Sequence, residues 1–130
     1  MKPKWWNKAN KYLIKKDKTI SKLIKSYKGY LTTRNNFFYS LTRSIISQQI
    51  SVSAADSIFK RFEKKCNNTI IPKNVLKLKI SDLRKCGLSK MKALGIKSLA
   101  KKITEKSFNP KLIKRMSDED AINYLSSLRQ

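Results

Sequence analysis

Two amides and a serine, Gln48, Gln49 and Ser51, are the side chains of this sequence best placed to recognise a partner chemically. They follow a run of apolar residues at helical spacing, so their hydrogen-bonding groups would stand at a corner between two helices, on a rigid support. The same residues also suit a simpler structure, in which the glutamines are solvated and Ser51 caps the next helix. Taken alone, the residues favour this simpler structure.

Other kinds of site chemistry lack their usual residues. The chain has no His, and Cys66 and Cys86 stand apart without a CxxC pair, which excludes zinc and iron–sulfur sites and leaves Ser-His or Cys-His catalysis without its base. The acidic run at 117–120, SDED, is typical of a helix start rather than of a metal site. We therefore expect no metal, and two reduced, buried thiols.

The composition is strongly basic. The chain has 31 Lys plus Arg against 8 Asp plus Glu, which gives a net charge of +23 and favours a phosphate-bearing polyanion as partner. Only six of the basic residues are Arg, so the charge favours contacts with a nucleic-acid backbone over bidentate recognition of bases. A generic basic surface and affinity for an anionic membrane surface are the alternatives that the charge leaves open.

No segment predicts export or membrane insertion. The start MKPKWWNK lacks the apolar core of a signal peptide, and the longest apolar runs are only a few residues. Together with the unpaired cysteines, this indicates a cytoplasmic protein, in a bacterial cytosol or nucleoid.

The elements that must position these side chains are predicted to be helices throughout. Only three Gly and three Pro occur, no alternating apolar pattern persists, and helix start and stop signals recur at short intervals. We expect an all-α, orthogonal bundle of about 6–8 helices. Their apolar positions lie within residues 5–13, 20–27, 37–46, 54–66, 72–78, 81–86, 89–106 and 121–128, with a further turn opened by Asn109-Pro110.

Two of these segments are expected to carry most of the core. The apolar stripe over residues 37–46 predicts the most buried helix. Gly95, inside the helix that starts at Ser89, costs roughly 1 kcal/mol relative to Ala, which indicates packing rather than chemistry. The residues that this helix is expected to bury are Met91, Leu94, Leu99 and Ile103.

Three segments, in the same order, resemble the DNA-3-methyladenine glycosylase II branch of the helix-hairpin-helix DNA glycosylase superfamily. Residues 5–17 are similar to the family's W-x3-A-x3-L-x3-D start, and residues 45–51, IISQQIS, resemble its IxSQQxS corner. Residues 83–93, LRKCGLSKMKA, are similar to its LRxCGLSxxKA segment. The resemblance spans Trp5 to Leu128, and the second and third segments together are fairly specific.

The resemblance implies a protein that repairs double-stranded DNA with alkylated bases. In such enzymes the damaged purine is flipped out of the stack, and an Asp carboxylate assists hydrolysis of the N-glycosidic bond without a metal or organic cofactor. By this resemblance Gln49 probes the space left by the extruded nucleotide, Gln48 anchors the local backbone, and Ser51 belongs to the same DNA-facing corner.

The sequence departs from the family at the catalytic segment. The glycine-rich hairpin and the Asp that follows it are absent, so both are expected beyond residue 130, and residues 1–130 are expected to form a single incomplete helical domain. We assign no catalytic residue, because each of the five aspartates is predicted to cap a helix or to lie on a solvated face. The chain is expected to be monomeric and inactive alone.

Four further residues are weaker candidates. Trp5 and Trp6 could contribute to the base pocket, although packing of the first helix is the simpler role. Lys90 and Lys92 follow the Gly87 turn near a helix start and could contact phosphate. The alternative function is a non-enzymatic, basic helical module that binds nucleic acid through its backbone.

Overall fold

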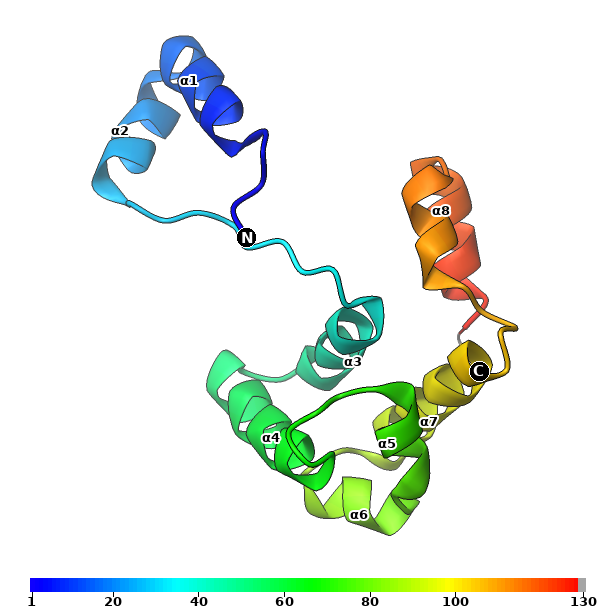
Figure 1. Ribbon diagram of the computed structural model, residues 1–130. Coiled ribbons are helices and arrows are strands. Elements are labelled where there is room, and N and C mark those ends of the chain that lie inside the picture. Colours follow the sequence, from blue (N-terminus) through cyan, green and yellow to red (C-terminus); the bar gives the residue numbers. More distant parts are fainter. Residues whose placement is uncertain (129–130) are drawn as a thin grey trace. The chain divides into compact units, whose positions relative to one another are not determined.

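The computed structural model describes residues 1–128, and all of their regular secondary structure is helical (Figure 1). This confirms the predicted all-α class. The elements are α1 (Trp6–Lys16), α2 (Lys18–Ser26), α3 (Phe37–Ser47), α4 (Val52–Lys65), α5 (Pro72–Lys77), α6 (Ile80–Lys85), α7 (Lys90–Thr104), the short 3-10 helix η1 (Pro110–Arg115) and α8 (Asp118–Ser126).

The chain divides into two compact units, Met1–Asn35 and a second unit that starts at Asn36. In the first unit, α1 and α2 pack against each other. The Asp17 carboxylate accepts the backbone N–H groups of Thr19 and Ile20 and so caps the start of α2, as predicted. That residues 1–130 make up one domain stays a prediction.

Side-chain caps fix the starts of the longer helices in the second unit. Asn36 caps α3, Ser51 caps α4, Ser89 caps α7 and Ser117 caps α8, each by accepting a backbone N–H of the first turn. Short polar side chains at these positions satisfy amides that have no partner inside the helix. The helix boundaries around the Gln48–Ser51 segment therefore follow from the sequence itself.

The central helix of the second unit is α7, which packs against α3, α5 and α6. Helix α3 buries Phe38, Thr42 and Ile46 and exposes only Ser44 and Ser47, in line with the expectation that it is the most buried helix. The expected buried face of α7 is wrong in part, because Met91 and Leu94 are 66% and 44% exposed. The buried residues are Ala93, Ile96, Leu99 and Ala100. The two alanines let neighbouring helices approach closely, so the buried face is centred on small residues rather than on the largest ones.

Basic side chains secure the ends of two short helices in this unit. Arg61 Nε of α4 donates to the carbonyl of Cys86 at the end of α6, at 2.8 Å. Lys97 Nζ of α7 donates to the carbonyls of Leu76, at 3.2 Å, and Leu78 at the end of α5. Both contacts place a positive charge on carbonyls that have no partner within their own helix.

Gly87 follows the end of α6 in the left-handed conformation, with φ of +102°. A Cβ there would lie 3.0 Å from Ile58 Cγ1 and 3.1 Å from an Arg61 nitrogen. Gly95 differs, because no atom lies within 4 Å of the Cβ position. The expectation that Gly95 serves close packing is therefore wrong.

Helix α8 is held to the core by an aromatic contact. The rings of Phe108 and Tyr124 stack with centroids 4.8 Å apart, and the Tyr124 hydroxyl accepts the backbone N–H of Asn109 at 2.9 Å. Within residues 1–128, no helix is long and apolar enough to cross a membrane.

Candidate nucleic-acid interface

The turn between α3 and α4 has an unusual backbone. Gln48 has φ of −58° and ψ of 130°, and Gln49 has φ of +58°. The two angles of Gln48 and the positive φ of Gln49 are those of the central positions of a type II turn, whose second position normally favours Gly or Asn. A side chain such as Gln in the left-handed region costs roughly 1–2 kcal/mol, and such strain gathers at functional positions. Residues 48–51 are called the glutamine corner below.

The side chains of the glutamine corner are open to solvent. Gln48, Gln49 and Ser51 are all exposed. Ser51 Oγ accepts the Ala54 N–H at 3.2 Å, which leaves its hydroxyl proton free to be donated to a partner. In this geometry Ser51 can therefore cap α4 and contact a partner at the same time.

Two aliphatic side chains accompany the amides. Ile50 is 37% exposed and Val52 is 78% exposed. Neither residue is among the candidates predicted from the sequence. The signal that could have found them is their position on either side of a helix cap, where neither falls on the apolar face of α3 or α4.

A lysine from the central helix binds the back of the corner. Lys92 Nζ donates to the carbonyl of Ile46 at 2.8 Å and to the carbonyl of Gln48 at 2.7 Å. This contact joins the start of α7 to the end of α3 across 46 positions of sequence. Lys90 and Lys92 are the two lysines predicted to contact phosphate. The ammonium group of Lys92 is bound to backbone carbonyls instead.

Lys90 is the freer of the two lysines. It is exposed at the first position of α7 and makes no hydrogen bond or ion pair with any residue of the described range 1–128. The first turns of α4 and α7 carry no acidic residue, so their N-terminal amides and dipoles are not neutralised locally. Because Lys92 links the corner to α7, both helix starts lie beside it.

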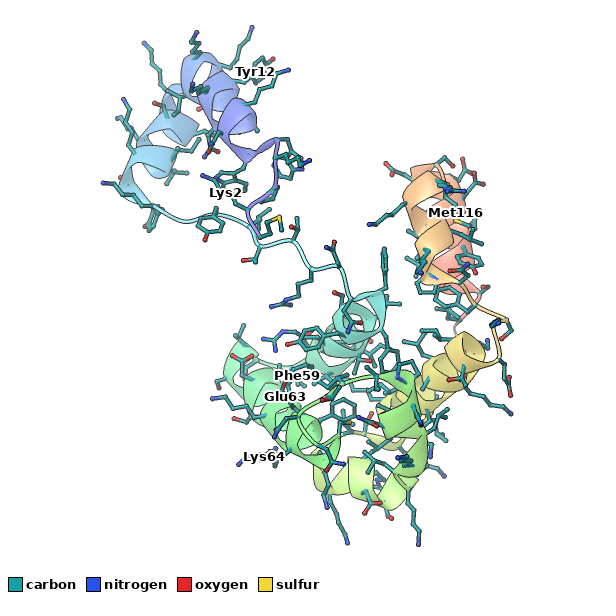
Figure 2. The ribbon with its side chains drawn as sticks, viewed as in Figure 1. Lys2, Tyr12, Phe59, Glu63, Lys64 and Met116 are labelled. Carbon is teal, nitrogen blue, oxygen red and sulfur yellow. The ribbon has the colours of Figure 1, made fainter. Side chains whose placement is uncertain are left out.

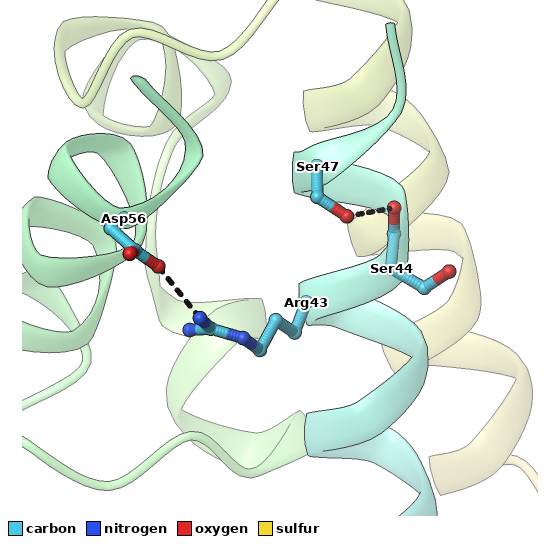
Figure 3. Close-up of polar contacts among 4 residues, drawn as sticks. All are labelled: Arg43, Ser44, Ser47 and Asp56. Atoms are coloured by element: carbon cyan, nitrogen blue, oxygen red, sulfur yellow. Dashed lines mark hydrogen bonds and ion pairs between the residues drawn. The ribbon is translucent and has the colours of Figure 1, made fainter. Parts of the chain in front are cut away.

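An ion pair braces the two helices that flank the corner. Arg43 of α3 and Asp56 of α4 approach to 2.6 Å (Figure 3), and the Arg43 guanidinium lies 4.8 Å from the centre of the Phe59 ring. In the same view Ser47 Oγ donates to the Ser44 carbonyl within α3, at 3.1 Å. The side chains of the glutamine corner are therefore exposed, while the two helices that flank it are linked by this ion pair.

A hollow of about 540 Å³ lies beside the corner, between α3, α7 and the end of α8. Gln48 and Lys92, together with two serines, supply its polar lining, and Gly95 leaves space in it because this residue has no side chain. The other lining residues are Leu41, Ser44, Ile45, Met91, Leu99, Leu125, Ser126 and Leu128. A largely apolar hollow of this size accommodates a planar ring or an apolar side chain.

The carboxylates and thiols already have structural roles. Asp17 and Asp82 accept backbone N–H groups at helix starts, Asp56 pairs with Arg43, and Asp120 accepts the Ser117 hydroxyl. Burial, with Cys86 and Glu63 nearby, raises the pKa of Cys66 to about 11, so this thiol is protonated at neutral pH. Across residues 1–128, no cluster of three or more metal-ligating side chains occurs.

Trp5 and Trp6 belong to the first unit, whereas the glutamine corner belongs to the second. Their ring centroids lie 5.8 Å apart, and Trp5 is 56% exposed. Both line a hollow of about 550 Å³ formed with α2 and residues 27–30. A role for these indoles in a base pocket stays a prediction.

The chain as a whole carries a large excess of positive charge. If each of the 8 acidic side chains were paired with one cation, 23 of the 31 Lys and Arg residues would still have no acidic partner. Figure 2 labels one exposed cation, Lys64, near the end of α4. This excess of charge suits contact with a polyanionic backbone.

Comparison with known proteins gives the family. The model of the HhH-GPD superfamily of base excision DNA repair proteins matches residues 42–126. The chain belongs to this superfamily. The match includes the glutamine corner, the start of α7 and α8.

Among curated relatives, an alkylbase DNA glycosidase-like protein of Schizosaccharomyces pombe is 28% identical and covers 95% of this chain and 62% of its own length. A DNA-3-methyladenine glycosylase of Saccharomyces cerevisiae is 31% identical and covers 78% of this chain and 39% of its own length. The solved structure of a 3-methyladenine DNA glycosylase of S. pombe, in complex with abasic DNA, matches with a TM-score of 0.76 and 28% identity. That match covers 92% of this chain and 62% of the other. The chain thus spans less than two-thirds of the length of each of these proteins.

Proposed function

We propose that this chain is the damage-probing part of a DNA glycosylase that removes alkylated purines from double-stranded DNA. The observation that carries the proposal is the glutamine corner, where exposed amides stand on a strained turn that Lys92 holds, in a strongly basic chain. The names of the relatives, which include 3-methyladenine glycosylases, support the same substrate class.

Each feature of the corner suits a step in opening a duplex. Flipping a base out of the stack costs a few kcal/mol, and a side chain that enters the gap offsets part of this cost. The Gln49 amide would enter the gap and hydrogen-bond the orphaned partner base, while Ile50 and Val52 would cover apolar sugar and base edges. Ser51, Lys90 and the starts of α4 and α7 would hold the phosphates on either side.

The hollow beside the corner fits the same proposal. Its largely apolar lining and the amide of Gln48 would receive an electron-poor ring or the part of the enzyme that carries the reaction. The described aspartates cap helices, pair with Arg43 or lie in the first turn of α8, so bond cleavage is assigned to none of them. We infer a monomer that acts in a DNA-containing compartment, the cytosol or nucleoid of a bacterium.

The test is the Gln49→Ala variant of the 130-residue chain. Its affinity is measured for a duplex with an abasic-site analogue and for the same duplex without the lesion. Asn67→Ala is the matched control, because Asn67 is also an exposed amide with positive φ, 54°, at a turn after a helix. We expect Gln49→Ala to lose preference for the abasic duplex by about tenfold, the equivalent of 1.4 kcal/mol, and Asn67→Ala to retain it.

An equal loss of preference for the abasic duplex in Gln49→Ala and Asn67→Ala would contradict the proposal. Unchanged binding of both duplexes by Gln49→Ala would instead favour the alternative, a non-enzymatic basic module that holds nucleic acid through its phosphates.

A further inference from the structure

Lys92 occupies a position that the dipole of its own helix disfavours. It lies in the first turn of α7, where the positive end of the helix repels a cation. In contrast, α3 has no basic residue in its last turn, although cations stabilise that end. The bonds from Lys92 Nζ to the Ile46 and Gln48 carbonyls supply the missing charge to α3 from another helix.

The second of these bonds acts directly on the strained turn. Type I and type II turns differ by a flip of the peptide group between their two central residues. Here that peptide joins Gln48 to Gln49, and its carbonyl oxygen is the one that lies 2.7 Å from Lys92 Nζ. The bond therefore opposes the flip that would bring Gln49 back to negative φ.

We propose that Lys92 is a positioning residue, which holds the Gln48–Gln49 peptide in its type II orientation so that Gln49 presents its side chain to the duplex. The inference rests on the proposed function only in that Gln49 is the probing side chain. Lys92 itself need not touch DNA, because its ammonium group is already bound to two carbonyls. Its role at the corner is distinct from the phosphate contact proposed for Lys90.

The same helix offers a matched control. Lys97 also binds two carbonyls, those of Leu76 and Leu78, at the end of a neighbouring helix, but these belong to α5 and not to the corner. Loss of either ammonium group removes one charge and two hydrogen bonds from the second unit. Only the loss at Lys92 releases the Gln48–Gln49 peptide.

The experiment compares Lys92→Met, Lys92→Arg and Lys97→Met in the 130-residue chain. The first readout needs no DNA: the Cα and Cβ chemical shifts of Gln49, which report its backbone conformation. The second is the ratio of affinities for the abasic-analogue duplex and the intact duplex. We expect Lys92→Met to move the Gln49 shifts and to lower the ratio by about tenfold, because hydrogen bonds to a charged group are among the strong ones.

Two control variants, Lys92→Arg and Lys97→Met, separate the positioning role from a general loss of charge. Lys92→Arg should restore most of both readouts, since its guanidinium can also donate to two carbonyls. Lys97→Met should lower the melting temperature and change neither readout. Unmoved Gln49 shifts in Lys92→Met, or an equal loss of the ratio in Lys97→Met, would overturn the positioning role.

Two further outcomes keep the inferences separate. If the unsubstituted chain shows no preference for the abasic duplex but Lys92→Met still moves the Gln49 shifts, the positioning role stands and the proposed function fails. If Lys92→Met does not fold, hydrogen exchange of the lysine ammonium groups in the unsubstituted chain decides. The Lys92 ammonium should exchange far more slowly than that of exposed Lys90, and equal rates would overturn the proposal.

Discussion

Gln49 carries a long side chain at a backbone position that would suit glycine. Its φ of +58° lies in the left-handed region, whereas Gln48 beside it has an ordinary φ of −58°. A residue kept in a strained conformation, with its side chain exposed, contributes little to packing. The strain is explained if the side chain itself is needed at this place.

This contrast predicts different effects of glycine at the two neighbouring positions. Gln48→Gly should lower the free energy of unfolding by about 0.5–1 kcal/mol, because glycine gains freedom in the unfolded chain. Gln49→Gly should change the free energy of unfolding little or not at all, because relief of the left-handed strain offsets the greater entropy of glycine in the unfolded chain. Chemical denaturation of both variants measures the difference, and equal losses would show that Gln49 is unstrained.

The glycines of the second unit give a second paired prediction. Gly87→Ala places a Cβ 3.0 Å from Ile58 Cγ1 at φ of +102°, so the free energy of unfolding should fall by about 2 kcal/mol. Gly95→Ala meets no atom within 4 Å and should raise it by about 1 kcal/mol through better helix propensity. Thermal unfolding checks both signs. A lower free energy of unfolding for Gly95→Ala would mean that neighbouring atoms crowd the added methyl group.

At the scale of the elements, the helix starts could be predicted and the buried faces only in part. Asp17, Ser51, Ser89 and Ser117 act on amides two or three positions away, so local sequence is enough to identify them as caps. Which face of α7 is buried depends on three helices that pack against it, and no pattern within α7 reports their approach.

The candidate site shows the same division. The glutamine corner was identified from its motif, because its residues are contiguous. The partner of Lys92 lies 46 positions away, so nothing near Lys92 in the sequence indicates that its ammonium binds the end of α3. The left-handed φ of Gln49 likewise escapes prediction, since the residue is neither Gly nor Asn.

At the scale of the whole molecule, the charge of +23 divides into cations with internal partners and cations open to solvent. Lys92, Lys97 and Arg61 bind backbone carbonyls, and Arg43 pairs with Asp56. Lys90 is exposed and has no partner within residues 1–128. A basic composition thus overstates the number of side chains available to DNA.

This division predicts the salt dependence of binding. For an intact duplex, the slope of log K against log[salt] should fall in magnitude by about one in Lys90→Met, because one phosphate contact is lost. In Lys97→Met, which removes the same charge from a cation bound to carbonyls, the slope should change much less. Titrations at several salt concentrations measure both slopes. The same decrease in both variants would show that only net charge matters.

The most direct test of damage probing uses the unsubstituted chain. Its affinity is measured for two duplexes of one sequence, with and without a central abasic-site analogue, at low and at near-physiological salt. Phosphate contacts weaken with salt for both duplexes, whereas the contribution of Gln49 does not depend on released counterions. We expect tighter binding of the abasic duplex, with a ratio of affinities that persists or grows as the salt concentration increases. Equal affinities for the two duplexes at both salt concentrations would contradict it.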